Sequence, residues 1–308
     1  MNVRFYETFV FMKSIIRPLV FIAALLALSS FLETHAQDKV VRMTGVRFAY
    51  PLIEHWIDEY SKVNPGVQVV IEWRGSTDPS QYDILVEAYE HPEEIRRLRN
   101  YTYVGRYAIL PVANSTSAFA KLYVNRGLTT ETIKQIFFHD IYADKDKQQK
   151  IEAHYTTYTR LQKAGAPMVF ARYFKYEQKD IAGKGVAGSD EHLLKAVLRD
   201  TTGVTYLPTP VIYTKSGAPV AGLTPIPVDL NGNDRLNEDE KSFGNWTDAT
   251  GIISNAKSVH NVPVERIHLS VDKKTANPEA TAFIRWVADN GLNDLKDFGF
   301  LPLERQPN

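Results

Sequence analysis

The chain has 308 residues, no cysteine, and 36 basic and 36 acidic side chains, so its formal net charge is zero. A hydrophobic content of 44% is enough for two modest globular lobes with cores of their own. The neutral balance argues against nucleic acid as a general partner. Without cysteine, the chain has no disulfide, no thiol nucleophile and no lipid-anchored cysteine.

Residues 1–36 have the pattern of a secretory signal peptide. Lys13 and Arg17 precede an apolar run over residues 18–28, and small residues follow at 34–36. The pattern predicts a cleaved signal and a mature protein in the periplasm or secreted. An uncleaved anchor is the alternative, although the run is short for a membrane span.

The stretch around Gly45 predicts a strand, a tight turn and the start of a helix. Residues 40–43 read as a strand, Gly45 permits the turn, and Pro51 suits a first helical turn. The apolar residues that follow have helical spacing: Leu52, Ile53, Trp56, Ile57 and Tyr60. Free N–H groups in such a turn, together with Arg47, favour an anion. The alternative is an ordinary connection between a strand and a helix.

The rest of the chain continues this alternation of strands and helices. The patterns predict strands over 67–73, 82–86, 104–112, 155–161, 203–207 and 262–271. They predict helices over 92–99, 129–137, 168–174, 191–198 and 278–290. Gly183–Gly188 matches G-x-G-x-x-G without the preceding strand that a dinucleotide site requires, so we expect a loop there. The fold class is therefore α/β, with mainly parallel sheets covered by helices.

Several short motifs follow one another in a fixed order. Phe48, Pro51, Leu52 and Trp56 form Phe-x-x-Pro-Leu-x-x-x-Trp, and further motifs stand at 74–76, 128–137, 202–206, 262–266 and 283–303. Arg160 precedes Ala164-Gly165-Ala166 where a related pattern has Arg-x-x-x-Ser-Gly-Thr. In this order, the motifs resemble the PstS-type phosphate-binding proteins of ABC transporters.

That resemblance implies a type II periplasmic-binding-protein fold, with two lobes joined by crossing hinge strands and a ligand in the cleft. Lobe 1 would consist of residues 37–108 and 266–308, and lobe 2 of residues 109–265. The implied function is binding of phosphate or a similar small oxyanion and its delivery to an ABC transporter permease. It implies neither nucleic acid nor stable membrane insertion after signal cleavage.

The resemblance also implies a ligand set, which we list in chain order: Arg47, Phe48, Ser76, Asp83, Arg160, Ala164, Gly165 and Ala166. A guanidinium can grip an oxyanion with two parallel bonds. An aspartate only accepts, so it favours an anion that still carries a proton. We therefore expect Arg160 and Asp83 to face a common gap. The alternative is that these two residues form a structural ion pair.

Three positions depart from the family pattern. Ala164 and Ala166 replace two hydroxyl residues, and Arg47 replaces a threonine. These changes leave open a second function, that of a ligand-independent exported scaffold or adhesion module that has kept the fold.

A separate motif over Asp229–Glu240 follows the twelve-residue EF-hand loop. Oxygen-bearing side chains stand at positions 1, 3, 5, 9 and 12, Arg235 is the seventh residue, and the expected ligands are Asp229, Asn231, Asn233, Arg235, Asn237 and Glu240. Asp234 replaces the usual glycine, and aspartate tolerates the left-handed conformation. We expect a structural Ca²⁺ in an insertion spanning residues 225–245. A solvated Asn/Asp turn is the alternative.

The sequence shows no constellation typical of an enzyme. The eight histidines are scattered without zinc-ligand spacing, and no Gly-x-Ser-x-Gly elbow is present. We therefore expect a binding protein with no catalytic residues and no organic cofactor.

Overall fold

The computed structural model describes residues 39–73, 78–139, 151–255 and 259–304. The predicted signal peptide and Ser76 lie outside these residues. Apart from Lys39, the first residue of β1, the elements described below belong to one compact unit, Val40–Asn308.

The strands form one long path of hydrogen-bonded neighbours. Its order is β2 (Val67–Ile71), β1 (Lys39–Gly45), β3 (Ile84–Glu87), β9 (Val264–Asp272), β4 (Arg99–Asn114), β7 (Gly203–Pro208), β5 (Thr156–Arg160) and β6 (Lys184–Val186), and β8 (Leu223–Pro225) pairs with β4. The pairs β1–β3, β5–β6 and β5–β7 are parallel. The antiparallel pairs β3–β9, β4–β7, β4–β8 and β4–β9 all involve β4 or β9. Parallel pairs therefore flank two antiparallel crossing strands, which confirms the predicted fold class.

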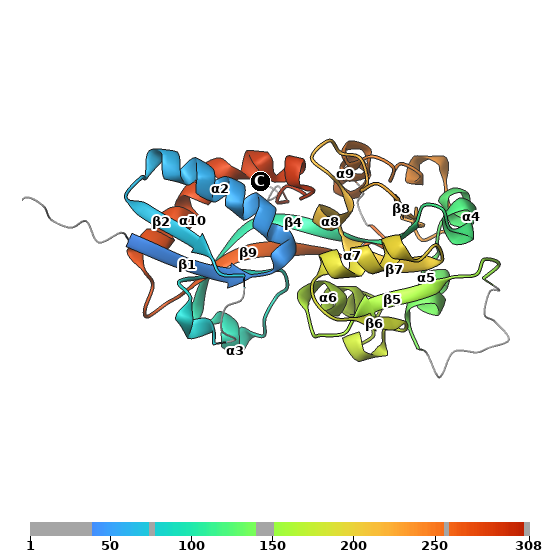
Figure 1. Ribbon diagram of the computed structural model, residues 1–308, viewed down its shortest axis with the longest axis horizontal. Coiled ribbons are helices and arrows are strands. Elements are labelled where there is room, and N and C mark those ends of the chain that lie inside the picture. The colour runs from blue at the N-terminus through green and yellow to red at the C-terminus, as the bar shows by residue number, and fades with distance from the viewer. Residues whose placement is uncertain (1–38, 74–77, 140–150, 256–258, 305–308) are drawn as a thin grey trace, which may run out of the picture. The chain divides into compact units, whose positions relative to one another are not determined.

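Strand β4 joins the two halves of this sheet because it changes partner along its length. Residues 99–108 pair with β9, and residues 109–114 pair with β7 and β8. We call the half with β1, β2, β3 and β9 the first lobe, and the half with β5, β6 and β7 the second lobe (Figure 1). The exact lobe boundaries stay a prediction.

The helices pack on these two halves. They are α2 (Tyr50–Val63), α3 (Glu93–Arg96), α4 (Ala118–Arg126), α5 (Thr130–Phe137), α6 (Gly165–Tyr173), α7 (Asp190–Arg199), α8 (Thr209–Ile212), α9 (Trp246–Asn255) and α10 (Pro278–Asn290). Short 3-10 turns are η1 (Arg47–Ala49), η2 (Pro79–Gln81), η4 (Gln178–Asp180), η5 (Glu238–Glu240) and η6 (Gly291–Phe298).

Helix α2 shows how the apolar spacing sets the packing. Leu52, Ile53, Trp56 and Tyr60 are buried on one face, as the spacing predicts. The indole Nε1 of Trp56 donates to the carbonyl of Gly291 at 2.9 Å, so the C-terminal part of the chain completes the core of the first lobe.

Three local predictions are wrong. The helix expected over 92–99 is limited to α3, because Arg99 already belongs to β4. Helix α6 begins at Gly165, three residues before the predicted start, because an apolar pattern does not show a first turn made of small residues. The glycine loop 183–188 contains the short strand β6, which pairs with β5.

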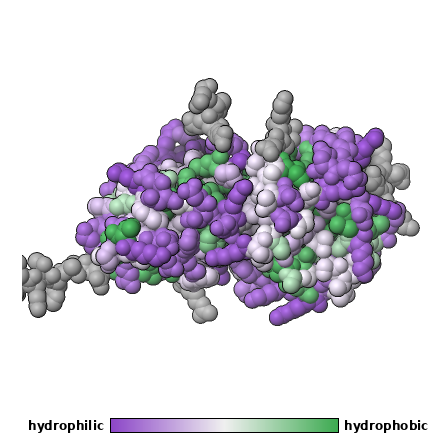
Figure 2. Space-filling model, turned by 90° about the horizontal axis from the view of Figure 1, so that it is seen from above, coloured by the Kyte–Doolittle hydropathy of each residue, from purple (hydrophilic) through white to green (hydrophobic). Residues whose placement is uncertain are grey.

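Hydrophilic residues cover most of the face shown in Figure 2, and smaller hydrophobic patches interrupt them. Within the described ranges, no helix has the length and hydropathy of a membrane-spanning segment.

Candidate functional site

The turn after β1 passes very close to the end of β3. Gly45 has φ of 152°, and a Cβ atom at this position would lie 2.0 Å from the carbonyl oxygen of Val86. Only glycine fits there. The N–H of Val46 donates to the same oxygen at 3.0 Å, which fixes the turn over β3.

Arg47 and Phe48 follow this turn in η1. The ring of Phe48 is buried against Tyr107, with 4.9 Å between ring centroids, so it anchors the turn in the core. Arg47 is exposed, and its Nη2 donates to the carbonyl of Trp73 at 3.2 Å. The first lobe therefore contributes an exposed positive charge on a turn that is fixed by the core.

The second lobe contributes Arg160 and the start of α6. Arg160 is the last residue of β5, and α6 begins five residues later. The first intrahelical bond of α6 runs from Met168 N to Ala164 O at 3.2 Å, and Pro167 has no N–H. The N–H groups of Gly165 and Ala166 therefore have no acceptor within the helix, and the helix dipole adds positive potential there.

These parts line one cavity of about 420 Å³. Residues 45–48 of the first lobe form one wall, and Arg160, Gln162, 164–166 and 188–190 of the second lobe form the other. The structure therefore brings together the predicted residues Arg47, Phe48, Arg160, Ala164, Gly165 and Ala166. We call this space the anion cavity.

A buried ion pair lies in the wall of the anion cavity. Arg160 Nη1 and Asp190 Oδ1 are 3.0 Å apart, and both side chains are about one-tenth exposed. Burial raises the pKa of the Asp190 carboxyl, and the Arg160 guanidinium works against that shift. The Nε of Arg160 is buried and has no hydrogen-bond partner among the described residues, so Asp190 does not satisfy every donor of this guanidinium.

Asp83 does not line this cavity, so the expectation that it meets Arg160 is wrong. Its carboxylate accepts from Arg42 N at 2.8 Å and from Asn277 Nδ2 at 3.1 Å. The β1–β3 register pairs Gly45 with Val86, so the cavity turn lies at the carboxyl end of these strands and Asp83 at their amino end. Asp83 stands immediately before β3, close to where the pattern predicts it, but this end of the strand does not face the cavity.

Sequence reasoning missed Asp190 and Gln162 as cavity residues. Asp190 lies 30 residues after Arg160, and no local pattern links them. Gln162 could have been found, because it stands between Arg160 and Ala164 in a stretch whose alternate residues share one face.

The predicted calcium loop is folded around its two terminal carboxylates. Asp229 is 1% exposed and accepts from the N–H groups of Gly232, Asn233 and Asp234. Glu240 is 3% exposed and accepts from the N–H groups of Leu230, Asn231 and Asn237. Asp234 has φ of 62°, the left-handed conformation expected at this position.

The donor set of this loop fits a hard cation. It combines carboxylate and amide oxygens with no nitrogen or sulfur ligand, which is what Ca²⁺ prefers. No group of three or more His, Asp or Glu side chains is arranged to hold an ion in the ranges that the structure describes. A cation here would therefore depend on amide and main-chain oxygens as well.

A second buried titratable cluster surrounds Glu87 in the first lobe. Ser270 Oγ donates to Glu87 Oε2 at 2.8 Å, His268 Nε2 lies 3.4 Å from the same oxygen, and His91 Nε2 contacts Oε1. Burial opposes ionisation of Glu87, but these partners together outweigh it and lower its pKa to about 2. None of these residues lines the anion cavity.

No family model matches the sequence, and no curated protein matches it significantly. Solved structures do match. One, assigned as a phosphate ABC transporter substrate-binding protein with bound phosphate from Clostridium perfringens, is 12% identical with a TM-score of 0.63 over 86% of this chain and 100% of that chain. An ABC-type phosphate transport receptor from Vibrio cholerae is 12% identical with a TM-score of 0.57 over the same shares. PstS from Borrelia burgdorferi is 14% identical with a TM-score of 0.50 over 87% of this chain and 100% of that chain.

This chain has the two-lobed fold of the periplasmic binding proteins. At these identities, the likeness shows the fold alone, and the function has to be argued from the cavity.

Proposed function

We propose that this chain is an exported solute-binding protein that binds phosphate or a similar small oxyanion in the anion cavity and presents it to an ABC transporter permease. The observation that carries the proposal is the buried Arg160, whose Nε has no partner among the described residues, at a cavity that the first turn of α6 also lines. A charged donor and free helix N–H groups together favour an anion. Two of the structural neighbours named above are described as a phosphate ABC transporter substrate-binding protein and a phosphate transport receptor.

The charges in the cavity favour an anion that carries a proton. Arg47 and Arg160 supply two positive charges, and Asp190 supplies one negative charge. An ionised carboxylate can only accept a hydrogen bond, so it tolerates hydrogen phosphate or hydrogen arsenate better than sulfate. Asp190 thus takes the role that the sequence assigned to Asp83.

The missing hydroxyls set the expected affinity. A hydrogen bond to a charged ligand contributes about 1.5–3 kcal/mol, so Ala164 and Ala166 each forgo roughly a tenfold to hundredfold gain. Arg47 offsets part of that loss because its guanidinium brings a full charge to the same cavity. We therefore expect binding on the order of micromolar.

Calorimetry of the mature chain with phosphate, arsenate, sulfate and molybdate tests the proposal. Arg160→Ala should abolish binding, but it leaves the buried Asp190 unpaired and threatens the fold. The double variant Arg160→Gln/Asp190→Asn removes both charges while keeping side chains of similar shape. It should also give no heat of anion binding. Arg42→Gln is the matched control, since this arginine side chain is 61% exposed, lies in the middle of β1 and does not line the anion cavity. A folded wild-type protein that gives no heat with all four anions would refute oxyanion binding.

One observation favours the alternative, a ligand-independent exported scaffold or adhesion module. The Arg160 charge is already paired with Asp190, so Arg160 does not need a ligand as its counter-charge. The same titrations decide between the two functions. The scaffold is supported if phosphate also leaves the melting temperature unchanged.

We also propose that the loop Asp229–Glu240 holds one structural Ca²⁺. The side chains of Asp229, Asn231, Asn233, Asn237 and Glu240 would supply oxygens, and Arg235 would supply its main-chain carbonyl. The cation would offset the repulsion between two buried carboxylates. With so few charged ligands, the affinity should be weak, on the order of 10⁻⁴–10⁻³ M, as in extracellular modules.

A further inference from the structure

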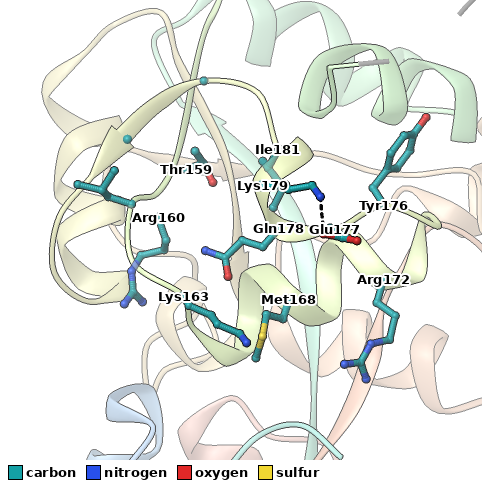
Figure 3. Close-up of a pocket in the computed structure, with 13 residues that line it drawn as sticks. Thr159, Arg160, Lys163, Met168, Arg172, Tyr176, Glu177, Gln178, Lys179 and Ile181 are labelled. Atoms are coloured by element: carbon teal, nitrogen blue, oxygen red, sulfur yellow. Dashed lines mark ion pairs between the residues drawn. The ribbon is translucent and has the colours of Figure 1, made fainter. Parts of the chain in front are cut away.

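A second and larger cavity opens on the second lobe beside the anion cavity. Its volume is about 760 Å³, and it lies between the end of β5, helix α6 and the turn η4 (Figure 3). We call it the groove. The lining residues that matter here are Lys163, Met168, Arg172, Gln178, Lys179 and Ile181.

The segment 160–164 separates the groove from the anion cavity. Arg160 lines both spaces, Gln162 and Ala164 line the anion cavity, and Leu161 and Lys163 line the groove. The groove is therefore a separate space behind the wall of the anion cavity.

The groove carries excess positive charge. Lys163, Arg172 and Lys179 line it together with a single carboxylate, that of Glu177. Lys179 Nζ pairs with Glu177 Oε2 at 2.9 Å. Lys163 and Arg172 form no ion pair with any residue in the described ranges, although Arg172 is near enough to Glu265 to work against the burial that raises the pKa of that carboxyl. A ligand here should carry at least two negative charges.

Apolar side chains also line the groove. Met168 and Ile181 belong to it, and so does the ring of Tyr176, which is stacked on Phe138 at 4.3 Å between centroids. Leu161 stands at its edge and is 65% exposed. A volume of this size suits an organic molecule rather than a bare inorganic ion.

We propose that the groove binds an organic polyanion of nucleotide size, with an apolar ring on the Met168 side and its acidic groups at Lys163 and Arg172. Such a ligand matches both the charges and the apolar lining. A simple inorganic anion would leave the apolar surface uncovered.

Gln178 connects the groove to the anion cavity. Its Oε1 accepts from Ala164 N at 3.2 Å, and its Nε2 donates to the carbonyl of Gln162 at 3.0 Å. Figure 3 shows this side chain reaching from η4 toward the segment that carries Arg160 and Lys163. A groove ligand that hydrogen-bonds the Gln178 amide breaks these two hydrogen bonds. The segment 160–164, which forms a wall of the anion cavity, is then no longer held by Gln178. Binding at the two sites is then coupled reciprocally, and this part rests on the function proposed above.

Titration of the full mature chain with ADP, adenosine and citrate tests the proposal. ADP should bind, adenosine should bind at least about tenfold more weakly because it lacks charge, and citrate should be weaker than ADP because it lacks a ring. Lys163→Glu should weaken ADP at least about tenfold. Lys195→Glu, an equal charge change at an exposed position of α7 that lines neither cavity, should leave ADP binding unchanged.

Two results would refute the proposal that the groove binds an organic polyanion. One is equal affinity for ADP and adenosine. The other is loss of ADP binding in Arg47→Gln, since Arg47 lines the anion cavity alone and that loss would move ADP there. Gln178→Ala should weaken ADP, because the ligand loses the amide contact, and at saturating ADP it should show no effect of ADP on phosphate affinity. If phosphate does not bind at all, the function proposed above fails, but the ADP titrations still test ligand binding in the groove.

Discussion

Replacing Asp190 by asparagine isolates the carboxylate that should make the anion cavity selective. The wild-type carboxylate accepts from Arg160 and presents only acceptors to the cavity. An anion without a proton, such as sulfate, then faces a like charge. Asparagine keeps an acceptor for Arg160 and adds an N–H donor at nearly the same place.

The expected effect on sulfate is large. A hydrogen bond to a charged group contributes about 1.5–3 kcal/mol, so one new N–H donor should tighten sulfate binding by roughly tenfold to hundredfold. Phosphate should change less, because it exchanges one hydrogen bond for another. The ratio of sulfate to phosphate dissociation constants should therefore fall by at least about tenfold.

The assay is calorimetry with both anions at a pH where phosphate is the hydrogen-phosphate dianion. Glu191→Gln is the control, since it removes a charge from the adjacent position of α7 without lining the cavity. Thermal melting checks the fold, because the variant leaves the Arg160 charge without a charged partner. If Asp190→Asn and Glu191→Gln give the same sulfate-to-phosphate ratio, Asp190 does not set selectivity.

Three further predictions concern stability. Glu87→Gln should cost about 3 kcal/mol at pH 7, because the folded pKa of about 2 lies below the ordinary value of 4.5, and urea unfolding should show that difference vanish as the pH falls to about 2. Gly45→Ala should cost about 2 kcal/mol or more in the same assay, because its Cβ would meet the Val86 carbonyl, whereas Gly66→Ala, which meets nothing within 4 Å, should cost far less. Millimolar Ca²⁺ should raise the melting temperature of the wild type but not of Glu240→Gln, and equal curves with Ca²⁺ and chelator would exclude the calcium site.

Much of the fold could be predicted from the sequence, because its local patterns agree with its tertiary packing. Helix α2 was predicted from apolar spacing and a proline in its first turn, and the same residues are the ones it buries. The helix expected over 129–137 is present as α5, and the hydroxyl of Thr129 caps it by accepting from Thr132 N at 3.3 Å. Helices α4 and α9 were not predicted, although α9 buries Trp246, Ala249, Thr250 and Ile253 at helical spacing, so that signal was overlooked.

The candidate site was harder to predict, because it depends on which ends of the strands meet. Arg160 and the small residues after it could be found, since they form one continuous motif. Asp83 was misplaced because a motif fixes a strand but not the end that faces the cavity. Arg160 pairs with Asp190, the first residue of α7. This pairing results from the packing of α7 beside β5, and no local sequence pattern indicates it.

The position of β9 has a consequence for synthesis of this chain. Strands β3 and β4 follow each other in sequence, yet β9 lies between them in the sheet. The first lobe therefore cannot close its sheet until residue 272 has left the ribosome, and its earlier strands must wait with unpaired edges. Strands β5, β6 and β7 have no such dependence among themselves. We expect vectorial folding in which the interior of the sequence becomes protease-resistant before its beginning does.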